Sequence, residues 1–489
     1  MPEHLISRDE AESDLVAAAA YLAEAVSSAD GRAEAMSAVV PLYLKRNDVD
    51  TAAELANSVD DGFTRDRLLT QVAEKCAETD DDEYALQLAE AIEDTGLRSQ
   101  ALERVALIKA SKGQLEAASG ITADLDHRDF ALAGIAAKQA ELGDKAAADA
   151  TLASIEFPSA KVHGLLEIAS SDVENKVELL AAAESAADEI EHNEERIRAL
   201  LDIGNLLIEA ERSDLAIRTF DHAKEESEAL DNVHRDAFLA GVALGFFRAG
   251  SLDLADRALD LVSDKTQTAA CLLGYAREFW KRGEHAEAID ALEEAYAILK
   301  SQRDREIRSS KSRYELFTSI AAQFAGFERG ERAIGIAQEI ESEPDHIAAL
   351  TQIAGILALR KEDEEARHAL QAIPDDASRV FALIAMSDSK EKNGDRDGAV
   401  VLLDEALVLA EAVPQVSARS SALNEIGRRF ETFGQTEKSA AAVASNLALI
   451  ATIRDESSRA LALANLSEVY PAEVREADAA SVRAILRDR

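Results

Sequence analysis

The sequence predicts an all-α protein, an α-solenoid of about thirteen helix-turn-helix repeats. A pattern of residues recurs about every 33 positions, and alanine recurs at one position in almost every repeat. Glycine or a small polar residue recurs between two apolar helical stripes. The composition agrees, because aromatic residues make up only 4% of the 489-residue chain and prolines number 7. Short helices packed through small side chains have such a composition, whereas β-sandwiches and barrels do not.

Most repeats begin at a basic residue, which defines a common frame. The repeats start near Arg32, Arg65, Arg98, Arg128, Lys161, Arg196, Arg235, Thr268, Arg313, His346, Arg379, Arg419 and Arg459. One helical hairpin cannot cover its own apolar face, so neighbouring hairpins must stack in a row. We therefore expect an N-terminal capping helix within residues 1–31 and a repeat solenoid over residues 32–489, with the last repeat as the second cap.

The first helix of each repeat has an apolar stripe at positions 4, 7, 8 and 11 after the start, which is the spacing of one helix face. Position 15 then carries a residue that tolerates the left-handed backbone in which helices often end. Those residues are Gly113, Gly143, Gly250, Gly283, Gly394 and Gly434, with Asn47 and Asp80 in two other repeats. The pattern predicts a helix end and a tight turn there.

The second helix carries a small residue 20 positions after the start. This residue is alanine in twelve repeats and Ser439 in the other: Ala52, Ala85, Ala118, Ala148, Ala181, Ala216, Ala255, Ala288, Ala333, Ala366, Ala399 and Ala479. With the small residue at position 8, it lets the two helices approach closely. Three such pairs are Ala243 with Ala255, Ala276 with Ala288, and Ala354 with Ala366. Four longer repeats, which start at Arg196, Thr268, Arg379 and Arg419, have their extra residues after position 20, so their second helix or the next junction should be longer.

A paired-helix repeat with small residues twelve positions apart resembles the tetratricopeptide repeat (TPR) family. The matching positions in two repeats are Leu239, Val242, Ala243, Phe246 and Ala255, and Leu200, Ile203, Gly204, Leu207, Ala216 and Phe220. The resemblance covers residues 32–489 and implies a superhelix that binds other proteins. HEAT-like repeats are the alternative, although their units are usually longer. Pentatricopeptide RNA readers need a basic groove, which this chain lacks.

The sequence carries no motif for catalysis or for a cofactor. It has no glycine-rich phosphate loop, no HExxH and no Cys-x-x-Cys, so we predict no enzyme, no cofactor and no metal site. Cys76 and Cys271 fall in first helices and are expected to be apolar fillers. The string from Asn393 to Asp404 nearly follows a calcium-binding EF-hand loop, but the repeat frame places Gly394 in a turn and Ala399 inside the second helix.

The charge excludes some partners. With 94 acidic and 53 basic residues the net charge is −41, which disfavours nucleic acid. The longest apolar runs, 16–26 and 447–453, are too short to span a bilayer, and the N-terminus lacks the pattern of a secretory signal. We therefore expect a cytoplasmic protein that is not inserted in a membrane. The acidic surface suits a high-salt, halophilic cytoplasm, but an acidic protein of a mesophile would look similar.

The arginines that open the repeats are unexpected, because a cation at a helix N-terminus opposes the helix dipole. Most of them have an acidic residue within five positions upstream, as Asp375 and Asp376 precede Arg379. One interpretation is a junction contact, an ion pair or a carbonyl contact that joins the end of one repeat to the start of the next. The other is a row of positive charges that holds an acidic ligand.

The TPR resemblance implies that the first helices line a concave surface through positions 2, 5, 9 and 12. In the middle repeats these positions are largely apolar, and exposed apolar stripes with Trp and Arg tend to be binding sites. The candidate partner-binding residues are Phe130, Leu166, Leu244, Phe247, Leu273, Arg277, Trp280, Phe381 and Ile384. The alternative is that these residues pack between neighbouring repeats. We accordingly expect a scaffold that holds a segment of a protein or peptide partner, or else a structural subunit that docks by its convex or terminal surfaces.

Overall fold

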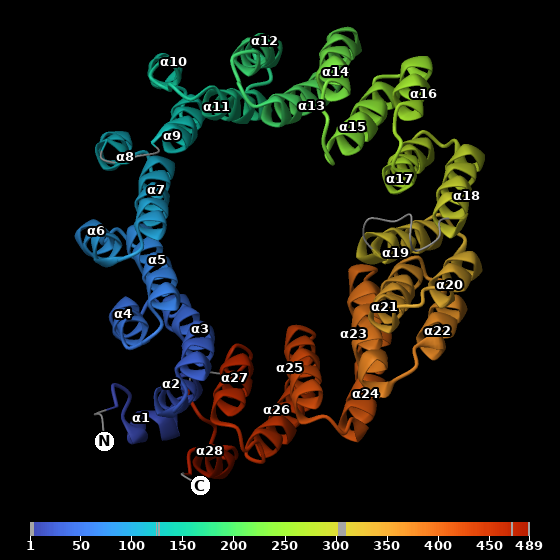
Figure 1. Cartoon of the computed structure of the whole chain (residues 1–489). Helices are drawn as coiled ribbons and strands as arrows, with labels where there is room; N and C mark the ends of the chain where they lie inside the picture. Colours follow the sequence, from blue (N-terminus) through green and yellow to red (C-terminus); the bar gives the residue numbers. More distant parts are fainter. Residues whose placement is uncertain (1–3, 124, 126–127, 302–309, 471–472, 488–489) are drawn as a thin grey trace. The chain divides into compact units, whose positions relative to one another are not determined.

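The computed structural model describes residues 4–123, 125, 128–301, 310–470 and 473–487, and the helices in this part of the chain form consecutive antiparallel pairs (Figure 1). A single β-bridge, between Asp14 and Glu473, is the only extended pairing found in these residues. The all-α solenoid predicted from the sequence is confirmed. Two short helices, α1 (Arg8–Ser13) and α2 (Leu15–Ala25), precede the first pair.

The first helix of each pair, called the A helix, carries the stripe at positions 4, 7, 8 and 11. The A helices are α3 (Ala29–Lys45), α5 (Gly62–Glu78), α7 (Thr95–Ser111), α9 (Asp129–Glu141), α11 (Pro158–Ser171), α13 (Asn193–Glu209), α15 (Arg235–Arg248), α17 (Lys265–Lys281), α19 (Ser310–Gly326), α21 (Glu343–Leu359), α23 (Asp376–Lys392), α25 (Val416–Thr432) and α27 (Glu456–Ser467).

The second helix of each pair, called the B helix, carries the small residue at position 20. The B helices are α4 (Val49–Asn57), α6 (Asp82–Ala91), α8 (Leu115–Thr122), α10 (Lys145–Ala153), α12 (Lys176–Ala187), α14 (Ser213–Glu228), α16 (Leu252–Asp260), α18 (His285–Ser301), α20 (Gly330–Gln338), α22 (Asp363–Ala372), α24 (Arg396–Ala412), α26 (Thr436–Ile450) and α28 (Ala479–Ile485). The four longer repeats have the longest B helices, α14, α18, α24 and α26, with 16, 17, 17 and 15 residues. The expectation that their extra residues lengthen the second helix is confirmed.

The turn between A and B helices has a left-handed residue at position 15 in eleven repeats. All eight predicted residues have positive φ, from 58° at Asn47 to 87° at Gly250. Three larger residues, Glu211, Glu328 and Lys361, adopt the same conformation with φ of 58°, 60° and 66°. The backbone of the repeat therefore imposes the left-handed turn even where the side chain disfavours it.

The alanine at position 20 is the contact between paired helices. Ten of the twelve predicted alanines are buried, and Ser439 is buried as well. Ala181 is an exception, because α12 starts two positions earlier in the frame than other B helices and buries Leu180 and Ala183 instead. Ala479 is half-buried, because it is the first residue of α28.

One B-helix side chain shows how closely the helices approach. Phe220 on α14 is fully buried, and its ring lies between Gly204 on α13 and Gly245 on α15. A Cβ atom at Gly204 would lie 2.4 Å from Cε1 of Phe220, and one at Gly245 would lie 2.6 Å from the same atom. Two consecutive A helices thus need glycine at these positions so that the ring can enter between them.

Arginines that open repeats contact the end of the preceding helix, which is α2 for Arg32 and a B helix for the others, as the junction-contact interpretation expected. In four repeats the guanidinium donates to the carbonyl oxygen six residues upstream, which belongs to the C-cap residue of that helix. These bonds join Arg32 to Val26, Arg98 to Ile92, Arg379 to Ile373 and Arg419 to Val413, at 2.8–3.1 Å. A helix end leaves such carbonyls without a partner inside the helix. Because these cations are engaged within the fold, they do not form a row of free positive charges.

A second junction contact uses the residue after the arginine in three repeats that begin with Arg-Asp. Oδ2 of the aspartate accepts hydrogen bonds from two successive backbone N–H groups just before the next A helix. The bonds join Asp66 to Glu93 and Asp94, Asp129 to Glu156 and Phe157, and Asp236 to Ser263 and Asp264, at 2.6–3.0 Å. Our sequence reasoning missed this contact, although the Arg-Asp pair at a repeat start was its signal.

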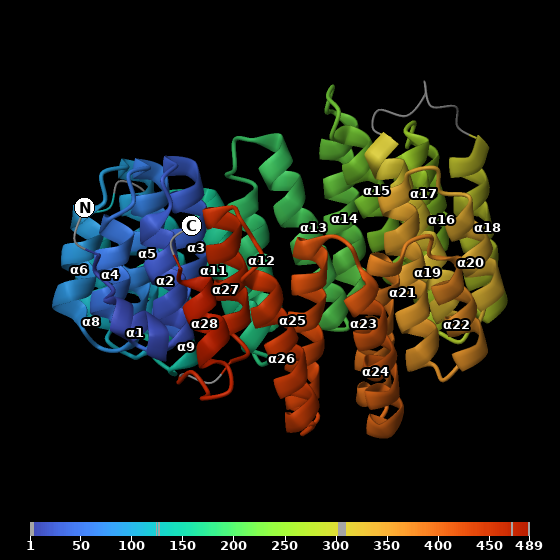
Figure 2. The same ribbon diagram turned by 90° about the horizontal axis from the view of Figure 1, so that it is seen from below.

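The chain divides into two compact units, residues 1–101 with 347–489, and residues 102–346. In the first unit the two ends of the chain pack together, because α2 lies against both α3 and α27 (Figures 1 and 2). The segment from Leu15 to Ala20 is buried at every position, so α2 has no solvent-facing side there. Lys45 pairs with Glu468 at 2.5 Å, and the Val474 N–H donates to the Ser13 carbonyl at 2.8 Å. The helices at the two ends of the chain therefore pack against each other within this unit.

In the second unit the A helices pack in sequence, α9 on α11, α11 on α13, α13 on α15 and α15 on α17. Figure 1 shows them in one row, with B helices α10, α12, α14 and α16 along the other side of that row. The A-helix side chains that do not face B helices therefore share one surface of this unit, which we call the A face.

Candidate functional site

Three of the predicted partner-binding residues are buried and do not reach the A-face surface. Phe247, Leu273 and Ile384 are 2%, 2% and 4% exposed. The Phe247 ring stacks on Tyr275 of the next A helix at 4.1 Å, and the Arg282 guanidinium lies 4.9 Å from its centre. These three residues are buried as the packing alternative expected, and for Phe247 the covering side chain comes from the next repeat.

Trp280 also takes part in packing between repeats. Its ring, which is half-buried, stacks on His285 at 4.0 Å and on Phe327 at 4.2 Å. Arg277 is exposed one turn earlier on α17. Phe247 and Trp280 therefore do not form a free aromatic surface. Three further candidates, Leu166, Leu244 and Phe381, are half-buried.

Phe130 is the candidate that the structure leaves most open among the apolar ones, at 44% exposed. It lines a groove of about 800 Å³ that crosses three consecutive A helices of the second unit. We call it the aromatic groove and define it by its lining residues: Glu103, Leu107 and Ser111 of α7, Phe130, Gly134, Ala137, Lys138 and Glu141 of α9, and His163, Glu167 and Ser171 of α11.

The floor of the aromatic groove is shaped by a close approach between α7 and α9. A Cβ atom at Gly134 would lie 2.5 Å from Cδ2 of Leu107. Glycine therefore lets the Leu107 side chain lie directly on the backbone of α9. Sequence reasoning assigned positions 2, 5 and 9 to this surface, and Phe130, Glu103 and Ala137 occupy them. It missed positions 6, 10 and 13, which face the same way because they are about one helical turn further along.

An aromatic cluster stands at one end of the groove, where α9 and α11 begin. The Phe130 ring lies 6.0 Å from that of Phe157 at 64°, and 6.2 Å from the ring of His163. Phe157 is 45% exposed and precedes Pro158, the first residue of α11. Its backbone N–H donates to Asp129 at 2.6 Å, so the junction contact holds Phe157 beside Phe130.

Carboxylates also line the groove. Glu103, Glu141 and Glu167 line it, one on each A helix. The single lysine of the lining, Lys138, pairs with Glu141 at 2.8 Å. His163 lies 3.9 Å from Glu167, and the side chains of both are more than half exposed. The groove thus combines open aromatic rings with an excess of negative charge.

A second groove, of about 690 Å³, lies between α25 and α27 in the first unit. Its lining combines uncharged polar residues, among them Ser417, Ser421, Asn424 and Asn465, with aliphatic ones. We call it the polar groove. At one end stand Glu425 and Arg428, whose side chains are 2.8 Å apart.

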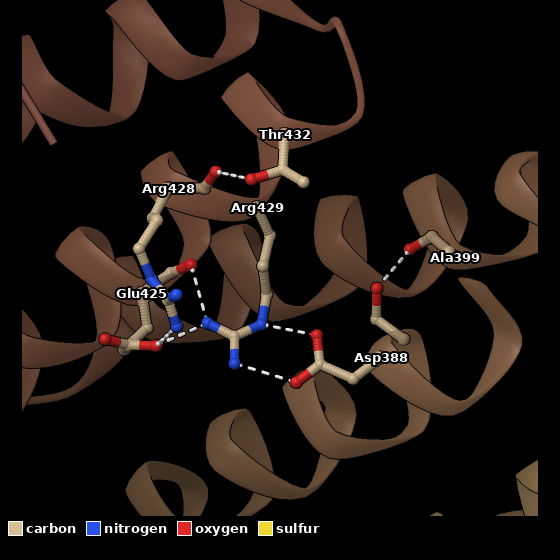
Figure 3. A network of polar contacts seen from close by, with 7 residues as sticks. Asp388, Ala399, Glu425, Arg428, Arg429 and Thr432 are labelled. Atoms are coloured by element: carbon tan, nitrogen blue, oxygen red, sulfur yellow. Dashed lines mark hydrogen bonds and ion pairs between the residues drawn. The ribbon is translucent and has the colours of Figure 1, made fainter. Parts of the chain in front are cut away.

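Charges next to the polar groove form a network between A helices (Figure 3). Arg429 makes two parallel bonds to the Asp388 carboxylate, at 2.6 and 2.7 Å, and also bonds to Glu425. Burial would raise the pKa of Glu425, but hydrogen bonds from Arg428 and Arg429 outweigh it and lower that pKa overall. The network ties α23 to α25 and leaves Arg428 as the more exposed cation.

Comparisons with known proteins were made against family models, curated proteins and solved structures. No family model matches the sequence, and no curated protein matches it. Ton1535 from Thermococcus onnurineus NA1 is similar over 71% of this chain and 97% of its own, with 19% identity and a TM-score of 0.25. The Rap protein complexed with competence and sporulation factor aligns over 72% and 98%, with 14% identity and a TM-score of 0.25. The Naa15/Naa10 structure bound to HypK-THB aligns over 88% and 85%, with 12% identity and a TM-score of 0.28.

The repeat geometry decides the architecture. Paired helices meet through small residues twelve positions apart, a left-handed residue separates them, and successive pairs stack through their A helices. The chain is a TPR-like solenoid.

Neither cysteine of this TPR-like solenoid lies at an open surface. Cys76 and Cys271 are 0% and 3% exposed. Burial raises the pKa of the Cys76 thiol to about 11 and that of the Cys271 thiol to about 12. Because a thiolate is the reactive form, both thiols are held in the unreactive state. They pack as the apolar fillers expected from the sequence.

The segment that resembles a calcium loop forms an ordinary helix pair of the TPR-like solenoid. Gly394 has φ of 78° in the turn, and Asp395 caps α24 by accepting from the Gly398 N–H at 3.0 Å. Ala399 is buried inside that helix, as the repeat frame predicted. The described residues contain no group of three or more His, Cys, Asp or Glu side chains placed to hold a metal ion. In the same part of the chain, no helix has the length and apolar character needed to cross a bilayer.

Proposed function

We propose that this protein is a non-enzymatic protein-interaction scaffold that holds a segment of a partner protein in the aromatic groove. The observation that carries the proposal is the exposed pair Phe130 and Phe157, at 44% and 45%. Phe130 lines a groove shared by three consecutive A helices, and Phe157 contacts Phe130 from the junction before α11. Exposed aromatic side chains that line a concave surface usually mark a place where another molecule binds.

The volume of the groove is suited to a segment of a partner protein with its side chains. Its volume of about 800 Å³ lies within the range of roughly 300–1,000 Å³ typical of binding pockets. The rings are positioned by the fold, because the Asp129 junction contact orients the start of α11. A partner therefore meets surfaces that are already ordered, which reduces the entropy lost on binding.

The test is affinity purification with mass spectrometry in the native host. Wild type is compared with the double variant Phe130→Ala/Phe157→Ala and with the control Phe63→Ala, which removes a 64% exposed phenylalanine from α5 in the other unit. We expect one set of proteins to be captured by wild type and the control but lost from the double variant. Thermal melts verify that all three proteins are folded. An identical captured set for all three folded proteins would contradict the proposal.

A second candidate function, a structural subunit that docks by its outer surface, is favoured by one observation. Val401 and Val408 are 59% and 72% exposed on α24, seven positions apart and hence on the same side of this B helix. If this surface docks in an assembly, Val401→Ser/Val408→Ser should release the protein from that assembly, whereas the Phe130→Ala/Phe157→Ala variant should remain in it. Size-exclusion chromatography of native-host extracts separates the two outcomes.

A further inference from the structure

We infer that the occupant of the aromatic groove is a basic protein segment whose lysine or arginine side chain lies against Phe130 and Phe157. This inference rests on the proposed function, because it specifies the chemistry of the partner held there. The argument comes from the rings, from the carboxylates around them, and from the contrast with the polar groove.

The rings are arranged to receive a cation. Phe130 and Phe157 meet at 64° with centres 6.0 Å apart, so the edge of one ring is directed toward the other. Both side chains are close to half exposed, which leaves ring surface free for an occupant. A positive group attracts the face of an aromatic ring, and the methylene stem of lysine or arginine covers apolar surface.

The carboxylates of the groove also favour a positively charged occupant. Glu103, Glu141 and Glu167 line the groove, and the lining contains only one lysine, which pairs with Glu141. An occupant that covers these groups removes water from them, and a carboxylate that loses water without gaining a partner costs free energy. A neutral occupant would leave that cost uncompensated, and an acidic one would add repulsion. A segment that carries Lys or Arg compensates it.

The polar groove lacks this combination of aromatic rings and carboxylates. Its lining has serine, asparagine and aliphatic side chains and no aromatic ring, and its charged residues are Glu425, Arg428 and Glu468. A generally acidic surface would attract basic peptides to both. The inference instead predicts that recognition depends on the side chains of the aromatic groove.

The experiment selects sequences from a randomised library of displayed 12-residue peptides on the full-length protein. Counter-selection on Phe130→Ala/Phe157→Ala removes peptides that bind elsewhere. We expect the surviving peptides to be enriched in Lys or Arg next to an apolar residue. Survivors that are mainly neutral or acidic would overturn the inference but leave the proposed function intact. If wild type enriches no sequence over the folded double variant, both the proposed function and the inference fail.

The role of the carboxylates is then measured by calorimetry with a selected peptide. Glu103→Gln/Glu167→Gln should weaken binding by about tenfold, since two charge contacts are lost. The matched control is Glu116→Gln/Glu294→Gln, which removes two exposed glutamates from B helices α8 and α18 and changes the net charge equally. The control should change the affinity by less than about twofold, because exposed charges beyond about 10 Å are screened at 0.1 M salt. Equal losses for the two double variants would overturn the inference, because binding would then follow net charge alone.

Discussion

Gly204→Ala is the substitution whose effect follows most directly from the packing of Phe220. The new Cβ atom would lie 2.4 Å from Cε1 of the ring, whereas carbon atoms prefer separations of about 3.5–4.0 Å. The ring has little room to move away, because on its other side it lies against the backbone of Gly245 on α15, where an added Cβ atom would also lie 2.6 Å from Cε1. The clash between the new Cβ atom and the Phe220 ring can therefore be relieved only if α13 and α15 move apart.

The expected magnitude combines two effects of opposite sign. Overpacking of this kind costs about 1–3 kcal/mol, while alanine in place of glycine inside a helix stabilises by about 1 kcal/mol. The second effect is measured alone by Gly335→Ala on α20, where the structure places no atom within 4 Å of the new Cβ. We expect Gly335→Ala to raise Tm and Gly204→Ala to lower it. The free energies of the two variants should differ by about 1–3 kcal/mol.

Differential scanning calorimetry of the full-length protein provides the assay. One kcal/mol corresponds to roughly 2–4 °C for 150–250 residues, and both glycines lie in the unit of residues 102–346. Adding Phe220→Leu to Gly204→Ala should recover part of the loss, with a coupling free energy of at least about 0.5 kcal/mol. Equal increases in Tm for Gly204→Ala and Gly335→Ala would refute the account of how these helices pack.

Three further predictions concern other parts of the chain. Asp66→Ala should destabilise the protein by about 2–4 kcal/mol, because Asp66 is buried and accepts hydrogen bonds from two backbone N–H groups and from Arg65. In denaturant titrations the exposed control Asp290→Ala should leave the free energy of unfolding almost unchanged. Equal losses of stability for the two variants would count against the junction contact. Burial raises the pKa of the Cys76 and Cys271 thiols in the folded state to about 11 and about 12, whereas the unfolded chain releases these protons at lower pH. The free energy of unfolding should therefore fall as the pH rises above about 9. Tm measured from pH 7 to 11 tests this, and the fall in Tm should be smaller in Cys76→Ala. Deleting residues 456–489 should lower Tm and increase dye binding to exposed apolar surface, because α27 covers α2; an unchanged Tm would show that the terminal helices do not stabilise each other.

The partner-binding surface was only partly predictable from the sequence. The repeat frame placed Phe130 on the A face, and the structure leaves it open. The same frame placed Phe247 on that face, yet Tyr275 of the next repeat covers its ring. The position of a residue within a helix indicates the direction of its side chain. The exposure of that side chain also depends on the size of the neighbouring side chains that pack on it. Phe157 lies in a junction outside both apolar stripes, so only the structure, with the bond from its N–H to Asp129, revealed its place beside Phe130.

The sequence by itself determined the repeat: paired helices, a left-handed turn and alanine contacts that bury ten of twelve predicted positions. These features depend on residues within about 33 positions of one another and recur along the chain, so a weak local signal becomes decisive when the repeats are compared. Only the tertiary structure decided that α27 covers α2 and that the open aromatic rings gather at α9 and α11. Contacts between residues more than 400 positions apart leave no periodic trace, because they form once along the chain and do not recur from repeat to repeat.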